Sequence, residues 1–147
     1  MTRINLIDPS ELCDKHLMAE YRELIRIPNA VWNGTMQTKY DNVPNEYVLG
    51  TGHVKFFVDK MLWLFERHSI LYDELRFREF NVREIIWPDH MIEFFMSNNL
   101  WNEYNPNGKD INLNLSRIID RLPENPKWKF RPEPLYYEAQ TKETSKT

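Results

Sequence analysis

The chain has 147 residues, about one domain's worth, of which 41% are hydrophobic and 14% aromatic, so it can bury a core and is not disordered as a whole. Its formal net charge of -3 excludes a global electrostatic attraction to nucleic acid, so DNA binding would need local clusters of Lys and Arg. Its four glycines cannot form a Walker loop or a complete G-x-G-x-x-G motif, which excludes phosphate binding by those loops.

Cysteine content and hydropathy bear on the compartment. The single cysteine, Cys13, cannot form an intrachain disulfide, which fits a reducing compartment and argues against a structural zinc finger. No apolar run approaches the roughly 18 residues that span a bilayer, and the N-terminus lacks the apolar stretch of a signal peptide. We expect a monomer without membrane contact that is cytoplasmic, or a viral protein that acts in the cytoplasm of its host.

A first helix is predicted to begin at Asp8. Asp8 can cap it, Pro9 suits its first position, and Glu11 can complete a capping box. Apolar residues then recur at spacings of three and four, as on one face of a helix: Leu12, Cys13, Leu17, Tyr21, Leu24 and Ile25. Pro28 is predicted to end or bend this helix, and the polar stretch over about 32–45 is typical of a loop.

A central helix is predicted beyond Gly52. A broad apolar face runs from Val54 to Leu75 and leaves room for a kink. Residues 81–89 contain a Trp-Pro pair and are predicted to form a connector, which a short helix follows over about 90–100.

The last helix is predicted after a strong turn at residues 105–108. Asp110 can cap it, and its apolar positions continue up to Pro123. Strand alternation is weak throughout the chain. We therefore expect a compact all-α domain of about three main helices over 1–139, with an extended aromatic C-terminal segment, and a disordered polar tail over 140–147.

A basic stripe on the first helix is one candidate for nucleic-acid contact. Lys15, Arg22 and Arg26 lie at helical spacing on one face, and Arg3 extends the stripe. Ion pairing on a solvated face is the alternative, because acidic residues lie on the same helix: Asp14, Glu20 and Glu23.

A second basic stripe begins with Arg117 and Arg121 on the last helix. It continues into a segment where lysines alternate with aromatic residues: Lys127, Trp128, Lys129 and Phe130. Such interleaving is expected where phosphates are neutralised and unstacked bases find a stacking surface. Aromatic residues near a chain end also commonly cover a core, and this alternative stays open.

Two kinds of chemistry are candidates for the first helix and the residues before it. His16, Glu20 and Glu23 share a face, but no second histidine stands at ligand spacing, which favours a structural or capping histidine over a metal ligand. No Ser or Cys lies in a nucleophile motif. The α-amino group, with a pKa of about 7.7–8.0, is partly neutral at pH 7. Because Thr2 is small, we expect removal of Met1, which would free a threonine amine for Schiff-base chemistry.

An ordered set of motifs extends over roughly residues 1–130. The set begins with Met-Thr-Arg-Ile-Asn-Leu and continues with His-Leu-Met-Ala-Glu-Tyr-Arg-Glu-Leu at 16–24. Further motifs follow in order: Arg26, Leu49-Gly-Thr-Gly-His-Val54, Phe56-Phe57, Asp59-Lys60, Phe80-Asn81, Arg117 and Pro126-Lys-Trp128. Motifs at nearly fixed spacing are far more specific than a charge stripe, and in these the chain resembles phage-type endonuclease V, a pyrimidine-dimer DNA glycosylase with AP-lyase activity.

The resemblance implies a small all-α enzyme that acts on double-stranded DNA with damaged bases and uses no metal or organic cofactor. The freed Thr2 amine would attack C1′ of the damaged nucleotide, Glu23 would be the essential carboxylate, and β-elimination would nick the strand. Further residues match positions that hold the DNA backbone or lie near the catalytic centre: Arg3, His16, Arg22, Arg26 and Arg117. Arg121 replaces a lysine of the family and keeps the charge.

Departures from the family pattern leave further functions open. The segment after Pro28 is shorter and less basic than in the phage enzyme, which predicts weaker nonspecific DNA binding and a shallower salt dependence. The changed aromatic segment leaves a related lesion, such as a ring-opened purine, as an alternative substrate. The sequence is also compatible with a non-catalytic module that binds damaged DNA and with a helical interaction protein that has no nucleic-acid role.

Overall fold

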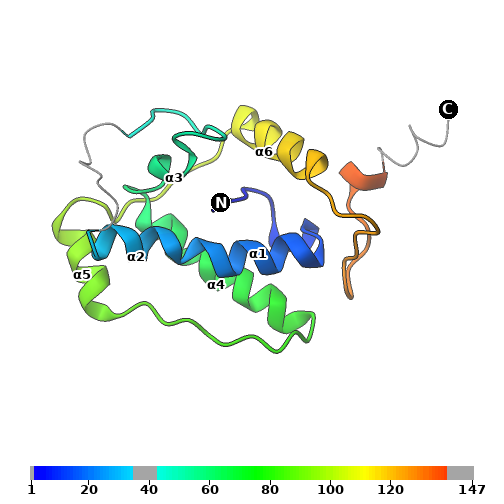
Figure 1. Cartoon of the computed structure of the whole chain (residues 1–147), viewed down its shortest axis with the longest axis horizontal. Coiled ribbons are helices and arrows are strands. Elements are labelled where there is room, and N and C mark those ends of the chain that lie inside the picture. The colour runs from blue at the N-terminus through cyan, green and yellow to red at the C-terminus, as the bar shows by residue number, and fades with distance from the viewer. Residues whose placement is uncertain (1, 35–42, 139–147) are drawn as a thin grey trace.

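Helices joined by extended segments make up the described part of the chain. The computed structural model describes residues 2–34 and 43–138, and over these ranges it holds a 3-10 helix, η1 (Pro9–Glu11), and six α-helices. Figure 1 shows α1 (Asp14–Leu24), α2 (Arg26–Trp32), α3 (His53–Phe56), α4 (Met61–Phe77), α5 (Asp89–Ser97) and α6 (Gly108–Asp120). The all-α prediction is confirmed, although the helices are shorter and more numerous than expected. The predicted tail over 140–147 lies outside the described residues.

The first helix begins later than the capping signal predicts. Asp8 caps only η1, where its carboxylate accepts from the Ser10 N–H at 2.8 Å. Leu12 is extended, and both Leu12 and Cys13 are fully buried, so α1 starts at Asp14. Burial of these two side chains outweighs the local capping box, and a helix start at Asp8 was wrong.

Pro28 divides the first long helix as predicted. It has no N–H to donate to the carbonyl of Leu24, and α1 ends at Leu24. α2 begins at Arg26 and continues in nearly the same direction (Figure 1).

The predicted central helix is interrupted rather than continuous. α3 ends at Phe56 and α4 begins at Met61, and the intervening Phe57 and Val58 are fully buried. The connector and the short helix that follow α4 are confirmed, the latter as α5.

The cap of α6 is Asn107 and not the predicted Asp110. The Asn107 side chain accepts from the Asp110 N–H at 2.8 Å, and the Asp110 carboxylate accepts from the Asn107 N–H at 3.4 Å. This reciprocal capping box places Asp110 in the first turn of the helix.

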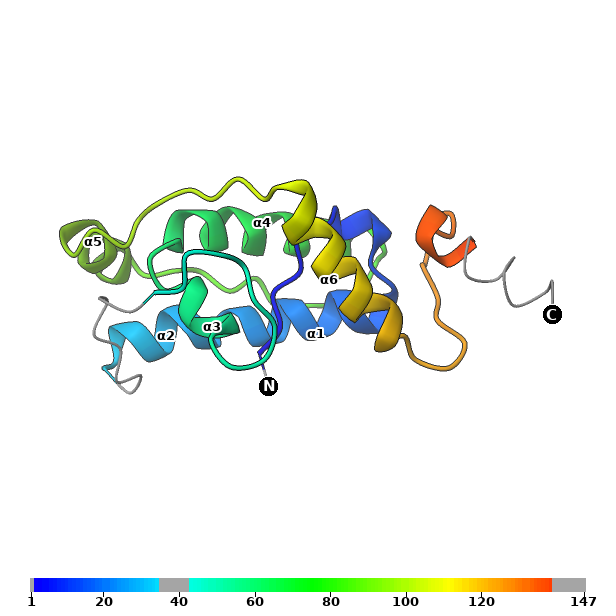
Figure 2. The same cartoon turned by 90° about the horizontal axis from the view of Figure 1, so that it is seen from above.

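Two packing layers position the N-terminal segment, residues 2–8. α1 packs on α4, and α2 packs on α5. The segment runs between α1 and α6 in both views (Figures 1 and 2). The buried core extends from this segment through both layers and includes Ile4, Leu17, Leu24, Leu64, Leu71 and Phe95. Within the described ranges, no helix has the length and apolarity needed to cross a membrane.

Candidate active site

Three hydrogen bonds fix the N-terminal segment along its length. The Arg3 N–H donates to Glu23 Oε1 at 3.2 Å, and the Ile4 N–H donates to His53 Nε2 at 2.9 Å. The Leu6 N–H donates to Asn114 Oδ1 at 2.7 Å. Because one residue spans about 3.8 Å, the 3.2 Å bond at Arg3 keeps the Thr2 nitrogen within about 7 Å of the Glu23 carboxylate.

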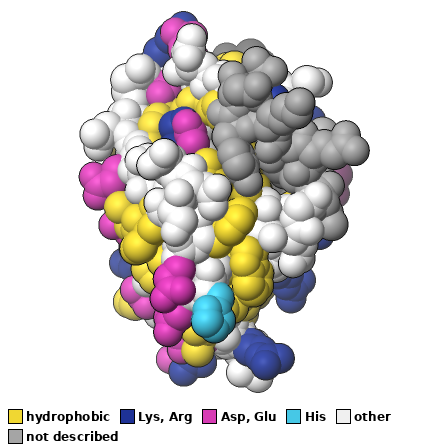
Figure 3. Space-filling model, turned by 90° about the vertical axis from the view of Figure 1, so that its left-hand side faces the viewer, with side chains coloured by type: hydrophobic (Ala, Val, Ile, Leu, Met, Phe, Trp, Pro, Cys, Tyr) yellow, Lys and Arg dark blue, Asp and Glu magenta, His cyan; other side chains and the backbone are white. Residues whose placement is uncertain are grey.

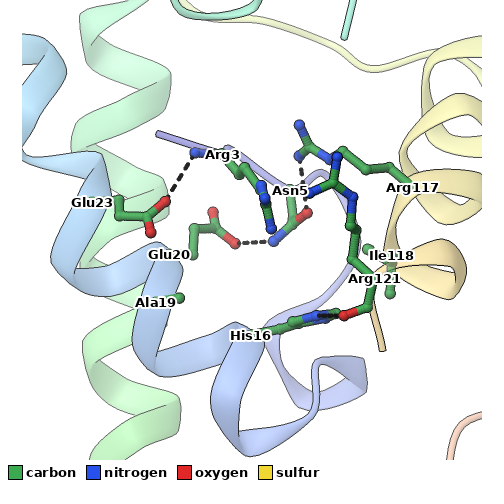
Figure 4. Close-up of a pocket in the computed structure, with 9 residues that line it drawn as sticks. All are labelled: Arg3, Asn5, His16, Ala19, Glu20, Glu23, Arg117, Ile118 and Arg121. Carbon is green, nitrogen blue, oxygen red and sulfur yellow. Dashed lines mark hydrogen bonds between the residues drawn. The ribbon is translucent and has the colours of Figure 1, made fainter. Parts of the chain in front are cut away.

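A small cavity opens beside this segment. Its volume is about 40 Å³, and three elements line it: the N-terminal segment, α1 and α6. The lining residues, drawn in Figure 4, are Arg3, Asn5, His16, Ala19, Glu20, Glu23, Arg117, Ile118 and Arg121. A cavity of this size has room for ordered water.

Positive charge dominates the cavity wall. None of its three arginines forms an ion pair with a carboxylate in the part of the chain that the structure describes. Arg117 Nη2 donates to the Ile4 carbonyl at 3.1 Å and to Asn5 Oδ1 at 3.3 Å. Burial lowers the pKa of Arg117, and the neighbouring Arg3 lowers it further. Such a site favours an anionic ligand over a cationic one.

The two carboxylates of the cavity have different surroundings. Glu20 is 1% exposed and pairs with Arg67 through both oxygens, Nε to Oε2 at 2.8 Å and Nη2 to Oε1 at 3.0 Å. Asn5 Nδ2 also donates to Glu20 Oε1 at 3.0 Å. Glu23 has no cationic side chain paired with it among the described residues and accepts only from the Arg3 backbone. Of the two carboxylates, Glu23 is therefore the one whose charge no described cationic side chain balances at close range.

His16 joins α1 to the end of α6. Its Nε2–H donates to the carbonyl of Arg121 at 3.0 Å, and its Nδ1 is buried with no hydrogen-bond partner in the described structure. Burial lowers the pKa of His16, which favours the neutral ring. His16 and the cavity carboxylates do not form a metal site, and the described residues contain no group of three His, Cys, Asp or Glu side chains placed to hold a metal ion.

Five predicted DNA-binding residues lie outside the cavity lining. Arg22 and Arg26 are exposed on α1 and α2. Trp128 is only 6% exposed, and its Nε1–H donates to the Glu11 carbonyl at 2.9 Å, so the indole packs at the end of η1. Lys127 and Lys129 flank it, and Lys129 Nζ lies 5.1 Å from the centre of the Phe80 ring.

Three basic side chains gather at one place on the molecule. The end of the molecule that α2 and α5 form shows mainly apolar, acidic and uncharged side chains in its described part (Figure 3). Arg3, Arg117 and Arg121 meet instead between α1 and α6 (Figure 4). This local cluster is the kind of feature that a chain with a negative net charge needs for contact with phosphates.

Sequence reasoning missed several residues that support the site. Tyr47 donates its hydroxyl proton to the Ile4 carbonyl at 3.1 Å, and Asn114 Nδ2 donates to Asn5 Oδ1 at 2.9 Å. Asn114 is fully buried between apolar positions of α6, and such a polar residue on an apolar face was a signal that could have been used. Tyr47 carried no such signal.

One comparison with known proteins bears on the chain. A family model described as pyrimidine dimer DNA glycosylase matches residues 1–87 of the 147. The matched range contains the N-terminal segment, α1 and the segment with Tyr47 and His53, and it ends before α6. The match therefore covers Thr2 and Glu23, while Arg117 and Arg121 lie beyond it.

Proposed function

The chain belongs to the pyrimidine dimer DNA glycosylase family, and we propose that it excises UV-induced dimers through an imine on the Thr2 amine and then nicks the strand as an AP lyase. The hydrogen bond from the Arg3 N–H to Glu23 carries this proposal, because it holds the chain end beside an unpaired carboxylate. DNA with damaged pyrimidines is the substrate that family membership indicates. Removal of Met1 is the precondition.

The first step exchanges the base for the amine at C1′. The neutral amine of Thr2 attacks C1′ and forms a new bond from its nitrogen to C1′, and the nitrogen then loses a proton. The glycosidic bond from C1′ to the base breaks, and its electron pair leaves with the base, which takes up a proton. Glu23 stabilises the positive charge that develops on the sugar. The positively charged cavity would receive the sugar–phosphate side of the damaged nucleotide.

The second step cuts the strand. The C1′–O4′ bond opens, O4′ takes up a proton, and nitrogen forms a protonated imine with C1′. A base then removes a C2′ proton, a C2′–C3′ double bond forms, and the 3′ phosphate leaves with its electron pair. Glu23 is the group that moves these protons, and the cavity arginines hold the flanking phosphates. Water hydrolyses the imine and returns the amine.

Borohydride trapping tests the proposal. Protein whose Met1 removal is verified by intact mass is incubated with a duplex that contains one cyclobutane thymine dimer. A covalent adduct and a nick are expected, and protein that retains Met1 should give neither. Glu23→Gln should abolish the nick, whereas Glu66→Gln, an exposed residue of α4 outside the cavity, should leave it unchanged.

The same assay distinguishes a lyase from a binding module. An adduct with full activity in protein that retains Met1 would refute the amine mechanism, and an undiminished nick with Glu23→Gln would remove Glu23 from its role. If the dimer duplex gives no adduct, abasic and ring-opened-purine duplexes are tested next. Binding to all of these duplexes without an adduct would identify a damage-binding module instead of a lyase.

A further inference from the structure

Both peptide groups of Ile4 are bound by a single segment, residues 43–53. The Ile4 N–H donates to His53 Nε2 at 2.9 Å, and the Ile4 carbonyl accepts from the Tyr47 hydroxyl at 3.1 Å. Ile4 is fully buried, so neither group can bond to water in exchange. These two bonds lie two residues from Thr2 and supplement the anchor that Glu23 provides at Arg3.

The His53 ring is held in the one form that can make this bond. Its Nδ1–H donates to the Val48 carbonyl at 2.8 Å, which leaves Nε2 with the lone pair that accepts from Ile4. Burial lowers the pKa of His53 to about 4, and the nearby Arg117 lowers it in the same direction. The Tyr47 ring meets the imidazole edge-on at 5.3 Å between centroids, which fixes its orientation.

Two glycines allow the segment to present His53 at this point. Gly50 has a φ of 69° and Gly52 a φ of 93°, a region that other residues adopt at a cost. A Cβ on Gly52 would also lie 3.4 Å from a Val48 methyl. The turn ends at Gly52, and His53 follows as the first residue of α3.

The bond between Arg3 and Glu23 uses a carboxylate that takes part in the proposed reaction. The bonds at Ile4 use His53 and Tyr47, which have no part in that reaction, so they hold the segment independently of Glu23. We propose that His53 is a positioning residue for the Thr2 amine, acting through the backbone of Ile4. This inference depends on the proposed function, in which that amine is the nucleophile.

Removal of the acceptor should affect the rate more than the affinity. His53→Phe keeps a ring of similar size and leaves the Ile4 N–H without its partner. His53→Gln can place its amide oxygen near the position of Nε2. A displacement of about 1 Å at a reacting group costs on the order of 100-fold in rate. We expect His53→Phe to slow imine trapping by about that factor and His53→Gln to stay within about tenfold of the wild type.

The experiment measures borohydride trapping under single-turnover conditions at saturating abasic duplex, with DNA affinity and Tm determined in parallel. DNA affinity should change little in either His53 variant. Reductive alkylation of the Thr2 amine by a small aldehyde, without DNA, should proceed at the wild-type rate, because positioning does not alter intrinsic nucleophilicity. Tyr47→Phe removes only a hydroxyl group and should slow trapping a few-fold. This variant tests the same anchor if His53→Phe fails to fold.

Trp87→Phe is the matched control. It removes the 3.2 Å hydrogen bond from Trp87 Nε1 to His68 Nδ1. This bond is buried and has a histidine acceptor, like the bond at His53, but neither of its residues lines the cavity. Its trapping rate should equal that of the wild type despite a lower Tm. A wild-type trapping rate in folded His53→Phe would refute the positioning role and leave the proposed function standing. The same conclusion would follow if Trp87→Phe slowed trapping as much as His53→Phe. Absence of any adduct with the wild type would refute the proposed function, and the positioning role with it.

Discussion

Replacement of Arg67 by methionine should destabilise the fold far more than replacement of Arg67 and Glu20 together. Arg67 is 4% exposed and bonds to both oxygens of Glu20, while its Nη1 donates to the Ile7 carbonyl at 2.6 Å. In Arg67→Met the buried Glu20 carboxylate keeps only the bond from Asn5. Breaking a buried pair from one side costs about 3–5 kcal/mol, a large share of a total stability of about 5–15 kcal/mol.

The double variant Arg67→Met/Glu20→Gln carries no buried charge at this place. The glutamine amide that replaces the carboxylate still accepts from Asn5, and the remaining loss is mainly the bond to the Ile7 carbonyl, which is worth about 1–2 kcal/mol. The double variant should therefore be more stable than Arg67→Met alone by on the order of 2 kcal/mol. Urea unfolding with an unchanged m-value measures the three free energies. A cost below about 1 kcal/mol for Arg67→Met alone would refute the reasoning.

Two further predictions concern stability. As the pH falls from 6.5 to about 4, His53 is protonated in the unfolded chain but stays neutral in the folded protein, so the free energy of unfolding should fall by up to about 3 kcal/mol. Burial also lowers the pKa of His68, which adds to this loss. Urea unfolding at pH 7 and pH 5 measures this, and a His53→Gln variant should show a shallower decline. Asn107→Ala removes the cap of α6 and should cost about 1 kcal/mol by thermal unfolding. Asn98→Ala, which removes only an exposed side-chain bond to the Phe94 carbonyl, is the control and should cost less.

Helical periodicity predicted where helices lie better than where they begin. The apolar spacing predicted α1 and α6, and Pro28 predicted the break that follows Leu24. The predicted helix boundaries were wrong where two local signals compete with each other or where a local signal competes with burial. Asp8 has every mark of a cap, but Leu12 and Cys13 are buried in extended backbone before the helix can start. A capping box contains two polar residues, and the pattern alone did not tell which one is the cap.

The site was less predictable because its partners are far apart in the sequence. Glu20 and Glu23 share a helix face, and only the contact with Arg67, on another helix, makes one a buried ion pair and leaves the other unpaired. Periodicity identifies faces and not partners. The candidate roles of Thr2 and Glu23 came from the resemblance to a family. The supporting role of His53 became visible only when the structure placed its ring beside Ile4.

Arg117 is predicted to bind the DNA backbone, and the structure suggests a direct test of this role. Its Nη2 donates to Ile4 and Asn5, and its Nη1 lies 3.5 Å from His53 Nε2, which is the long limit for a hydrogen bond, so a phosphate oxygen can compete for Nη1. Arg117→Gln should therefore lower DNA affinity across sequences and reduce the salt slope by about one unit.

Affinity measured at several salt concentrations tests this, with Arg76→Gln, an exposed residue of α4, as the control. Contact with one phosphate changes the slope because it releases about one counterion, whereas a purely structural arginine releases none. An unchanged slope together with slowed imine trapping would assign Arg117 to holding Ile4 alone. A reduced slope would show that one guanidinium both binds the DNA backbone and holds the segment that carries the nucleophile.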